Sequence, residues 1–113
     1  MRAERLKGHL DGLLLGVVAS GGPLHGYAII EELRRLSGGA FSLPEGTVYP
    51  ALHRLEKQRL LTSRWSTDTP RRRRVYELTD RGGQALCLER QAWSTFSGAM
   101  EAVLGGASWP TTV

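Results

Sequence analysis

The chain has 113 residues, of which 41% are hydrophobic and 23% are charged. That length fits one domain, and the composition excludes a mainly disordered chain, a collagen-like repeat and a membrane protein. The net charge of +4 makes nucleic acid a partner to consider, although net charge alone is a weak indication. Cys87 is the only cysteine, which excludes an internal disulfide and favours a reducing compartment.

Most of the positive charge lies in one segment. Residues 53–74 contain eight Arg and Lys residues and only two acidic residues, Glu56 and Asp68, so this segment carries +6. The last third of the chain, residues 81–113, has two basic and two acidic residues and is neutral. A basic block between near-neutral segments is typical of a surface that meets an anionic partner.

Two helices are predicted in the first third of the chain. Over Leu6–Ala19, apolar residues recur at helical spacing, and Gly8, Gly12 and Gly16 form a ridge without side chains. The ridge indicates either the close approach of a second helix or a weak helix held by its surroundings. The apolar run here is too short to cross a bilayer and has no signal-peptide cleavage site, so we expect a cytoplasmic protein without a membrane partner. The second predicted helix is Leu24–Leu36.

The third predicted helix begins with a capping signal. The segment Ser42–Glu45 matches a capping box with proline at an early helical position, and the helix is expected to extend to about Arg59. Pro50 lacks a backbone donor and leaves two alternatives. Either the regular helix begins near Thr47, or a kink lies at Gly46.

A hairpin follows the third helix. Leu60–Ser66 and Arg72–Leu78 are short and rich in β-branched and aromatic residues, and the polar, basic segment Thr67–Arg71 separates them. This pattern predicts two antiparallel strands that must lean on the helices, because an isolated hairpin is only marginally stable. Trp65 is interpreted as a packing residue, and so is Tyr27 on the second helix.

The last helix is the longest. Thr79 and Asp80 offer N-caps for a helix that reaches about Leu104 and is about 37 Å long. Its apolar residues fall within an arc of roughly 160°, interrupted only by Glu89. Preceding residues cannot cover so long a stripe, whereas a second copy of the chain could. The stripe comprises Ala85, Leu86, Leu88, Ala92, Trp93, Phe96, Ala99, Met100, Val103 and Leu104.

The element order is helix, helix, helix, hairpin, long helix. It predicts a mainly α fold with a two-stranded β wing: a winged helix-turn-helix plus a long C-terminal dimerisation helix. In that arrangement the third helix enters the major groove, and the wing meets phosphates or the minor groove. We expect residues 1–80 to form the DNA-binding domain, with its first helix joining the dimer interface. Residues 81–104 would form the dimerisation helix and residues 105–113 a flexible tail.

Three sequence segments strongly resemble the PadR family of bacterial transcriptional regulators. They are LHGY at Leu24–Tyr27, EGTVYPALHRLE at Glu45–Glu56 and RRVYELTDRG at Arg73–Gly82. The resemblance extends over Leu6 to about Leu104 and fits the shorter subgroup with a single C-terminal helix. Family members usually have glycine just before the first wing strand, where this chain has Arg59. The resemblance implies a dimeric repressor on a palindromic operator, with double-stranded DNA as partner and no cofactor.

The residues predicted to contact DNA lie on the third helix and the wing. Tyr49 in the matching motif is the first choice, and Ser42 precedes a helix N-terminus that would face phosphate. Arg54 either pairs with both acceptors of a guanine or forms an ion pair with a neighbouring carboxylate. Arg71 and Arg72, nearest the wing tip, are the wing arginines expected to reach phosphate. The full set is Ser42, Thr47, Tyr49, Pro50, His53, Arg54, Lys57, Arg71, Arg72 and Arg73.

The predicted dimer interface combines the first and last helices. Its residues are Leu6, Leu10, Leu13, Leu88, Ala92, Phe96, Met100 and Val103. Ligand-responsive members of the family can hold flat hydrophobic molecules between their two C-terminal helices, where aromatic side chains stack on them. Trp93 and Phe96 lie about where such a pocket for a small hydrophobic or aromatic effector would be. The alternative is that both are dimer core.

Other functions have less support in the sequence. His9, His25 and His53 lie on three separate elements and far from Cys87, so we predict neither a metal site nor catalytic residues, and we do not expect an enzyme. The alternative to a DNA-binding regulator is a winged-helix adaptor whose basic block contacts an acidic protein. RNA binding ranks last, because it would need stacking aromatics on a broader sheet.

Overall fold

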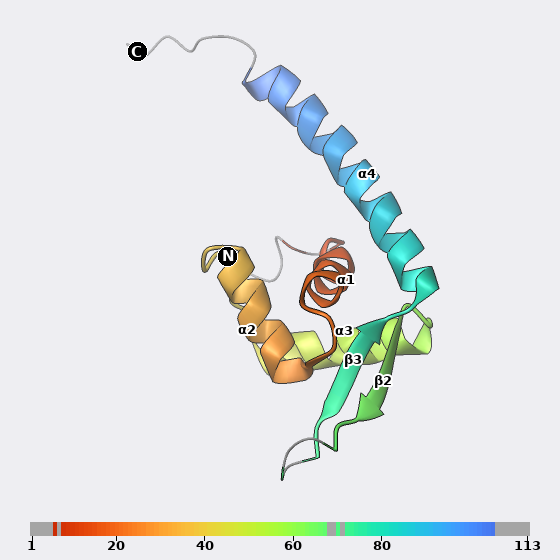
Figure 1. Cartoon of the computed structure of the whole chain (residues 1–113). Coiled ribbons are helices and arrows are strands. Elements are labelled where there is room, and N and C mark those ends of the chain that lie inside the picture. Colours follow the sequence, from red (N-terminus) through yellow and green to blue (C-terminus); the bar gives the residue numbers. More distant parts are fainter. Residues whose placement is uncertain (1–5, 7, 68–69, 71, 106–113) are drawn as a thin grey trace.

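The computed structural model describes Leu6, residues 8–67, Pro70 and residues 72–105. It has the mainly α, winged helix-turn-helix fold that the sequence predicts, with a long helix projecting from the compact part (Figure 1). The elements are α1 (Leu10–Gly21), β1 (Leu24–His25), α2 (Gly26–Leu36), α3 (Glu45–Lys57), β2 (Leu61–Trp65), β3 (Arg74–Leu78) and α4 (Asp80–Leu104).

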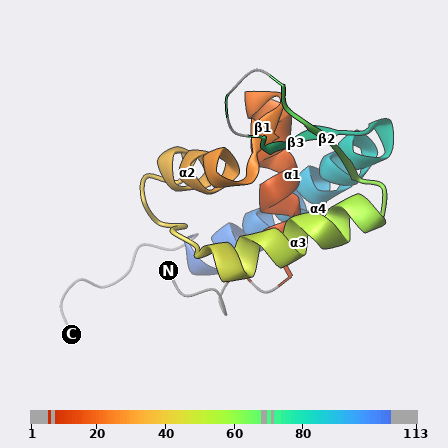
Figure 2. The same cartoon turned by 90° about the horizontal axis from the view of Figure 1, so that it is seen from below.

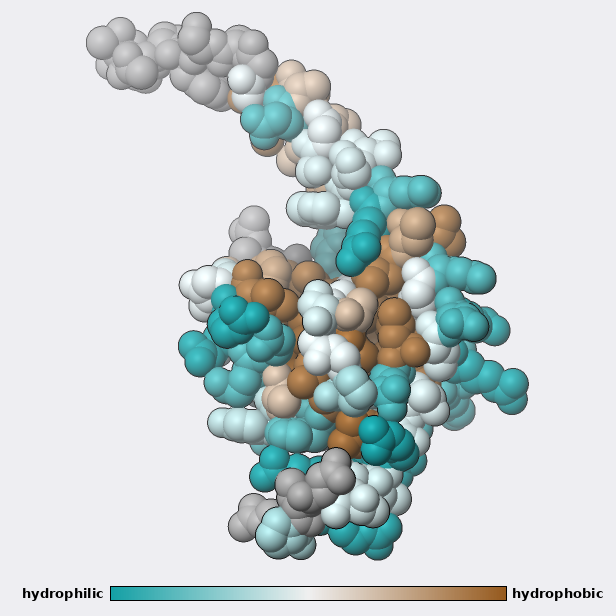
Figure 3. Space-filling model, in the orientation of Figure 1, coloured by the Kyte–Doolittle hydropathy of each residue, from teal (hydrophilic) through white to brown (hydrophobic). Residues whose placement is uncertain are grey.

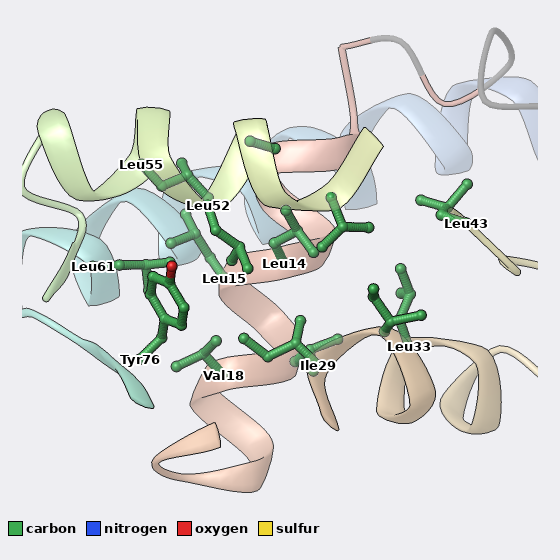
Figure 4. Packing of buried hydrophobic residues seen from close by; sticks show 14 of the residues in the cluster. Leu14, Leu15, Val18, Ile29, Leu33, Leu43, Leu52, Leu55, Leu61 and Tyr76 are labelled. Carbon is green, nitrogen blue, oxygen red and sulfur yellow. The ribbon is translucent and has the colours of Figure 1, made fainter. Parts of the chain in front are cut away.

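The hydrophobic core is built around α1. Leu14 and Val18 of α1 are buried against Ile29 of α2, Leu52 of α3 and Tyr76 of β3 (Figure 4). Fully burying an aliphatic or aromatic side chain of this size stabilises a fold by about 1.5–3 kcal/mol relative to leaving it exposed. The inward faces of α2, α3 and the sheet are therefore fixed by one central helix, which also fixes what their opposite faces present to solvent.

The first helix begins later than predicted. It starts at Leu10 rather than Leu6, because Gly8 has a left-handed backbone with φ +88° that ends any helix there. Two of the three ridge glycines remain in the helix and face α4. A Cβ atom on Gly12 would lie 3.1 Å from the Glu89 carboxylate, and one on Gly16 would lie 3.9 Å from Leu86. At Gly12, close approach of a second helix is therefore the correct alternative.

The sheet has three strands instead of two. Leu24 and His25, predicted as the first residues of the second helix, form β1 and pair with Tyr76 and Val75 of β3. The strand order is β1-β3-β2, so β3 is the central strand. The prediction of a helix here was wrong because the backbone groups along the open edge of β3 need partners, and this demand cannot be seen in local sequence.

The predicted capping box does not form at the start of α3. Ser42 lies outside the helix, and the N-cap residue is Pro44, which makes no side-chain cap. Its carbonyl instead accepts hydrogen bonds from the amides of Thr47 and Val48 at 3.0 and 3.2 Å. The helix begins at Glu45 and contains Pro50, so the alternative of a regular helix that begins only near Thr47 is wrong.

The turn from α3 into β2 has a left-handed residue that is not glycine. Arg59 has φ +64°, and the amides of Arg59 and Leu60 donate to the carbonyls of Glu56 and Leu55, both at 2.9 Å. This is a Schellman motif, in which the left-handed position is normally glycine. The Thr79 hydroxyl also donates to the Arg59 carbonyl at 2.7 Å, which ties this turn to the start of α4. The chain thus keeps the usual turn with an unfavourable residue type.

The last helix is anchored only at its first turns. The Thr79 hydroxyl accepts from the amide of Gly82 at 2.9 Å, as predicted for an N-cap. Gly82 packs so tightly that a Cβ atom there would lie 2.0 Å from the Leu60 carbonyl oxygen. Within Asp80–Leu104 the buried residues are Gly82 and Leu86, and the rest of the helix projects away from the core (Figure 1).

We expect Arg59→Gly to raise the free energy of unfolding by about 1 kcal/mol, because a side chain in the left-handed region costs about 1–2 kcal/mol and glycine has no such penalty. Urea unfolding followed by circular dichroism measures the change. Arg59→Ala is the control, since it removes the guanidinium but keeps a Cβ atom. If alanine stabilises the protein as much as glycine does, backbone strain is not the cause.

Candidate nucleic-acid interface

The outward face of α3 and the hairpin lie on the same side of the molecule (Figure 2). Val48, Leu52 and Leu55 are buried, so the positions between them on the helix are directed away from the core. The view from below shows α3 across the near face, with most of α4 behind it (Figure 2). The helix and the wing can therefore approach one flat partner together.

The described part of this surface contains nine of the ten predicted DNA contacts. Arg71 lies outside the described residues. Thr47 and Tyr49 are half-buried, at the edges of the exposed face of α3. The remaining residues are exposed: Ser42, Pro50, His53, Arg54, Lys57, Arg72 and Arg73.

Arg54 forms an ion pair with Asp11 of α1, which is the second of the two predicted alternatives. Both side chains are about half exposed, and an exposed pair of this kind contributes about 0–1 kcal/mol. So small a contribution means that Arg54 can exchange Asp11 for a base or phosphate acceptor at little cost. The pair also links α1 to the outward face of α3.

Tyr49 packs on the first residue of α2. A Cβ atom on Gly26 would lie 2.4 Å from Cε1 of the Tyr49 ring, so only glycine fits beneath it. This contact connects two of the motifs quoted above, LHGY and GTVYP. The packing fixes the ring at the point where α2, α3 and the sheet meet.

The wing carries an exposed tryptophan between two arginines. Trp65 pairs with Arg74 across the hairpin, and its side chain is 48% exposed. The guanidinium carbons of Arg72 and Arg74 lie 4.9 and 5.3 Å from the ring centroid, within the range of cation–π interaction. The interpretation of Trp65 as a packing residue was therefore wrong, because its strand extends beyond the core. Tyr27 is likewise exposed, on the outward side of α2.

Arg74 is further restrained by polar contacts with the base of the hairpin and with α3. Its Nε donates to the Ser63 hydroxyl at 2.7 Å, and its guanidinium lies 3.6 Å from the carboxylate of Glu56. Ser63 also donates to Glu56. Arg74 thus holds the wing against α3. Arg72 and Arg73, in contrast, have no carboxylate partner among the described residues.

His25 occupies the junction of β1 and α2. Its Nδ1 accepts a hydrogen bond from the amide of Ala28 at 3.2 Å and so caps α2. Its Nε2 lies 2.9 Å from Nη1 of Arg73 on the wing. Partial burial lowers the pKa of the imidazole below its ordinary value, and the positive charge of Arg73 lowers it further. The imidazole is therefore neutral at pH 7.

Two residues of this surface were missing from the predicted contacts, Trp65 and His25. A tryptophan within a strand whose partner strand carries several arginines was an available signal for the first. For His25 the available signal was its place at the start of the second helix, whereas its contact with Arg73, 48 positions further along the chain, could not be seen in the sequence.

The second predicted surface lies on α4. Apolar and weakly polar residues lie along much of the projecting part of α4 (Figure 3). Trp93 packs against Phe96 at a ring separation of 5.8 Å and against His9 at 5.7 Å. The large exposed apolar residues of α4 are Leu88, Trp93, Phe96, Met100, Val103 and Leu104.

The eight predicted dimer residues divide into two groups in one protomer. Leu88, Ala92, Phe96, Met100 and Val103 are exposed. Leu10 and Leu13 are partly buried against the core, and Leu6 is 5% exposed, so Leu6 has little surface left for a second chain.

Other kinds of site have little support in the described residues. The described residues contain no cluster of three or more metal-ligating side chains and no helix long and apolar enough to cross a membrane. Cys87 is exposed on α4.

The fold agrees with comparisons to known proteins. Residues 14–87 match the sequence pattern described as the transcriptional regulator PadR-like family. The chain belongs to the PadR-like family of transcriptional regulators. It is accordingly a DNA-binding regulator, and the predicted family is confirmed.

Individual relatives extend over most of the chain. The transcriptional regulator Rv3488 of Mycobacterium tuberculosis is 38% identical over 90 residues, which cover 80% of this chain and 78% of that protein. A PadR family transcription regulator from Clostridium difficile is 30% identical with a TM-score of 0.74, covering 85% of this chain and 98% of its own. A PadR-like transcriptional regulator from Bacillus cereus is 27% identical with a TM-score of 0.79, covering 92% and 99%.

We expect the stability of the protein to fall as the pH drops below about 6.5, the ordinary pKa of histidine. The folded state holds the pKa of His25 below that value, so the unfolded chain takes up a proton first and acid favours unfolding. The stabilisation is present above that pH and is lost below it. Urea unfolding at about pH 8 and about pH 5.5 measures the change.

His25→Asn is the matched variant, because asparagine also caps a helix but does not titrate in this range. It should lose stability less steeply with acid than the wild type does. All other residues are the same in the two proteins, so the difference between the two slopes reports on position 25 alone. Equal slopes for the two proteins would contradict the assigned role of His25.

Proposed function

We propose that the protein is a homodimeric repressor that binds a palindromic operator in double-stranded DNA. The single observation that carries this proposal is the opposed placement of two surfaces. The outward face of α3 and the arginine-bearing wing lie on one side, and the apolar stripe of α4 projects from the other (Figures 1 and 2).

On the DNA side, each residue has a role that its chemistry permits. α3 enters the major groove, where Thr47, His53 and Arg54 reach base edges. Lys57, Arg72 and Arg73 contact phosphates, which position the protein without reading sequence. Tyr49 lies at the edge of α3 and contacts the backbone beside the groove. Arg54 leaves Asp11 when it meets its acceptor in the groove.

The proposed dimer is supported by the apolar area that α4 exposes. Six large apolar side chains of α4 are exposed in one protomer, and a patch of this kind on a soluble chain marks an interaction site. A two-fold symmetric dimer buries the same stripe from both chains, and two symmetric half-sites in the operator follow from it.

The aromatic cluster of Trp93, Phe96 and His9 supports a finer proposal. A flat hydrophobic effector held between the two α4 helices would stack on these rings and release the repressor from DNA. It would do so only through different affinities for two spacings of the wings. The alternative is that these rings only form the core of the dimer. In that case an excess of effector would not change DNA binding.

Footprinting with the purified protein on genomic fragments tests the proposal. We expect a protected site with two half-sites about one helical turn apart and an affinity that falls linearly with the logarithm of salt concentration. Met100→Lys should weaken the dimer at least about hundredfold, because it would bury an unpaired ammonium group in the interface. Sedimentation measures the dimer, and operator affinity should fall with it.

Gln91→Lys is the matched control, since it adds the same charge on the opposite side of α4 and should leave the dimer intact. A single asymmetric half-site bound by a monomer would refute the dimer. Failure to bind any fragment at low salt would favour the protein-interaction adaptor.

We expect Trp65→Ala to weaken binding to specific and nonspecific duplexes alike by about two- to fivefold, which corresponds to about 0.5–1 kcal/mol for an exposed cation–π pair. The reason is that the ring holds Arg72 in place for a phosphate. Fluorescence anisotropy with labelled duplex measures the affinity. Trp65→Phe keeps a π face and should recover most of the loss, and an unchanged affinity of the alanine variant would show that the ring does not position the arginine.

A further inference from the structure

A cleft opens where β1, α2, α3 and the wing meet. Its volume is about 340 Å³. The described residues that line it are His25, Gly26, Tyr27, Tyr49, Arg73 and Arg74. None of these carries a carboxylate, and Arg74 is held by Glu56 and Ser63. The groups left to act inside the cleft are the imidazole of His25, the guanidinium of Arg73 and two phenol rings.

The hydrogen bonds of His25 fix its tautomer. The backbone amide of Ala28 can only donate, so Nδ1 of the ring, at 3.2 Å from it, must be the acceptor. In a neutral imidazole the other nitrogen then carries the proton. Nε2 is therefore a donor, and it is directed at the cleft and at Arg73.

The contact between His25 and Arg73 is consequently between two donors. Nη1 of Arg73 lies 2.9 Å from Nε2, yet a guanidinium has no acceptor. The two N–H groups cannot satisfy one another, and the described residues give neither of them an acceptor at the place where they converge. An oxyanion placed against both groups supplies that acceptor, and it also neutralises the arginine.

We propose that the cleft binds one backbone phosphate of duplex DNA, with His25 Nε2 and the Arg73 guanidinium each donating a hydrogen bond to its oxygens. This inference rests on the proposed function and names a phosphate contact of that same surface. The cleft adjoins Tyr49 of α3 and the wing, so a DNA strand along the groove edge passes it. The contact positions the protein, and it reads no bases.

Two substitutions separate the members of this pair. His25→Asn keeps an acceptor for the Ala28 amide and removes the Nε2 donor. Arg73→Gln removes the charge from an exposed position just before β3. Arg64→Gln is the control, because it removes the same charge from the other wing strand, where Arg64 is paired with Glu77 at 3.1 Å.

The probe is a labelled duplex of mixed sequence about 30 base pairs long, enough for two half-sites one helical turn apart. We expect each cleft variant to bind about tenfold more weakly, the loss for a hydrogen bond to a charged acceptor. The double variant should be about as weak as the weaker single variant, because both groups hold one phosphate. Arg64→Gln should change affinity by about twofold or less.

Salt dependence distinguishes the two donors. Arg73→Gln should reduce the slope of log affinity against log salt by about 0.9 for each bound chain, hence by about 1.8 for a dimer, since each chain loses one neutralised phosphate. His25→Asn should leave the slope unchanged, because a neutral imidazole displaces no counterion. A wild type that binds no duplex overturns the proposed function and this contact with it. Wild-type binding with cleft variants that match Arg64→Gln overturns the contact alone.

Discussion

The structure depends on the burial of α1. Leu14 and Val18 are enclosed by α2, α3 and β3, and Gly12 and Gly16 let α4 approach the same helix. One element thus sets the orientation of α3, the helix proposed to face DNA, and of α4, the helix that projects from the core. Because protein interiors are close-packed, a shift of α1 would be passed to both rather than absorbed. The ion pair of Asp11 with Arg54 adds a polar contact to this apolar link.

The parts of the fold that follow from local periodicity could be predicted. Val48, Leu52 and Leu55 recur at helical spacing and are buried, and the Thr79 cap and the length of α4 also follow from the sequence. Two of the predictions failed for different reasons. The failure at Leu24–His25 depends on a distant strand, whereas the failure at the start of α3 is local. Leu24–His25 is a strand because β3 has an open edge, and Pro44 replaces Ser42 as the cap of α3. The intrinsic helix or strand propensity of a segment does not show whether a distant strand needs a hydrogen-bonding partner.

The candidate interface divides in the same way. The residue types, the basic block and the family motifs predicted which segments would meet DNA, and the described arginines of the wing and α3 are exposed as expected. An ion pair of Arg54 was one of the two alternatives, but the partners could not be predicted, since Asp11 lies 43 positions from Arg54 and His25 lies 48 positions from Arg73. Trp65 was misjudged because the sequence does not state how far the hairpin extends beyond the core.

The shallow anchoring of α4 has an evolutionary consequence. Within Asp80–Leu104 only Gly82 and Leu86 are buried in the protomer, so the sequence beyond them is not constrained by the stability of the DNA-binding domain. Substitutions along that stretch can accumulate without unfolding the rest of the chain. In the proposed dimer, duplicated copies of such a gene can therefore diverge in which chains they pair with, while each copy retains its domain. Related regulators within one cell can then avoid forming mixed dimers through changes in this one helix.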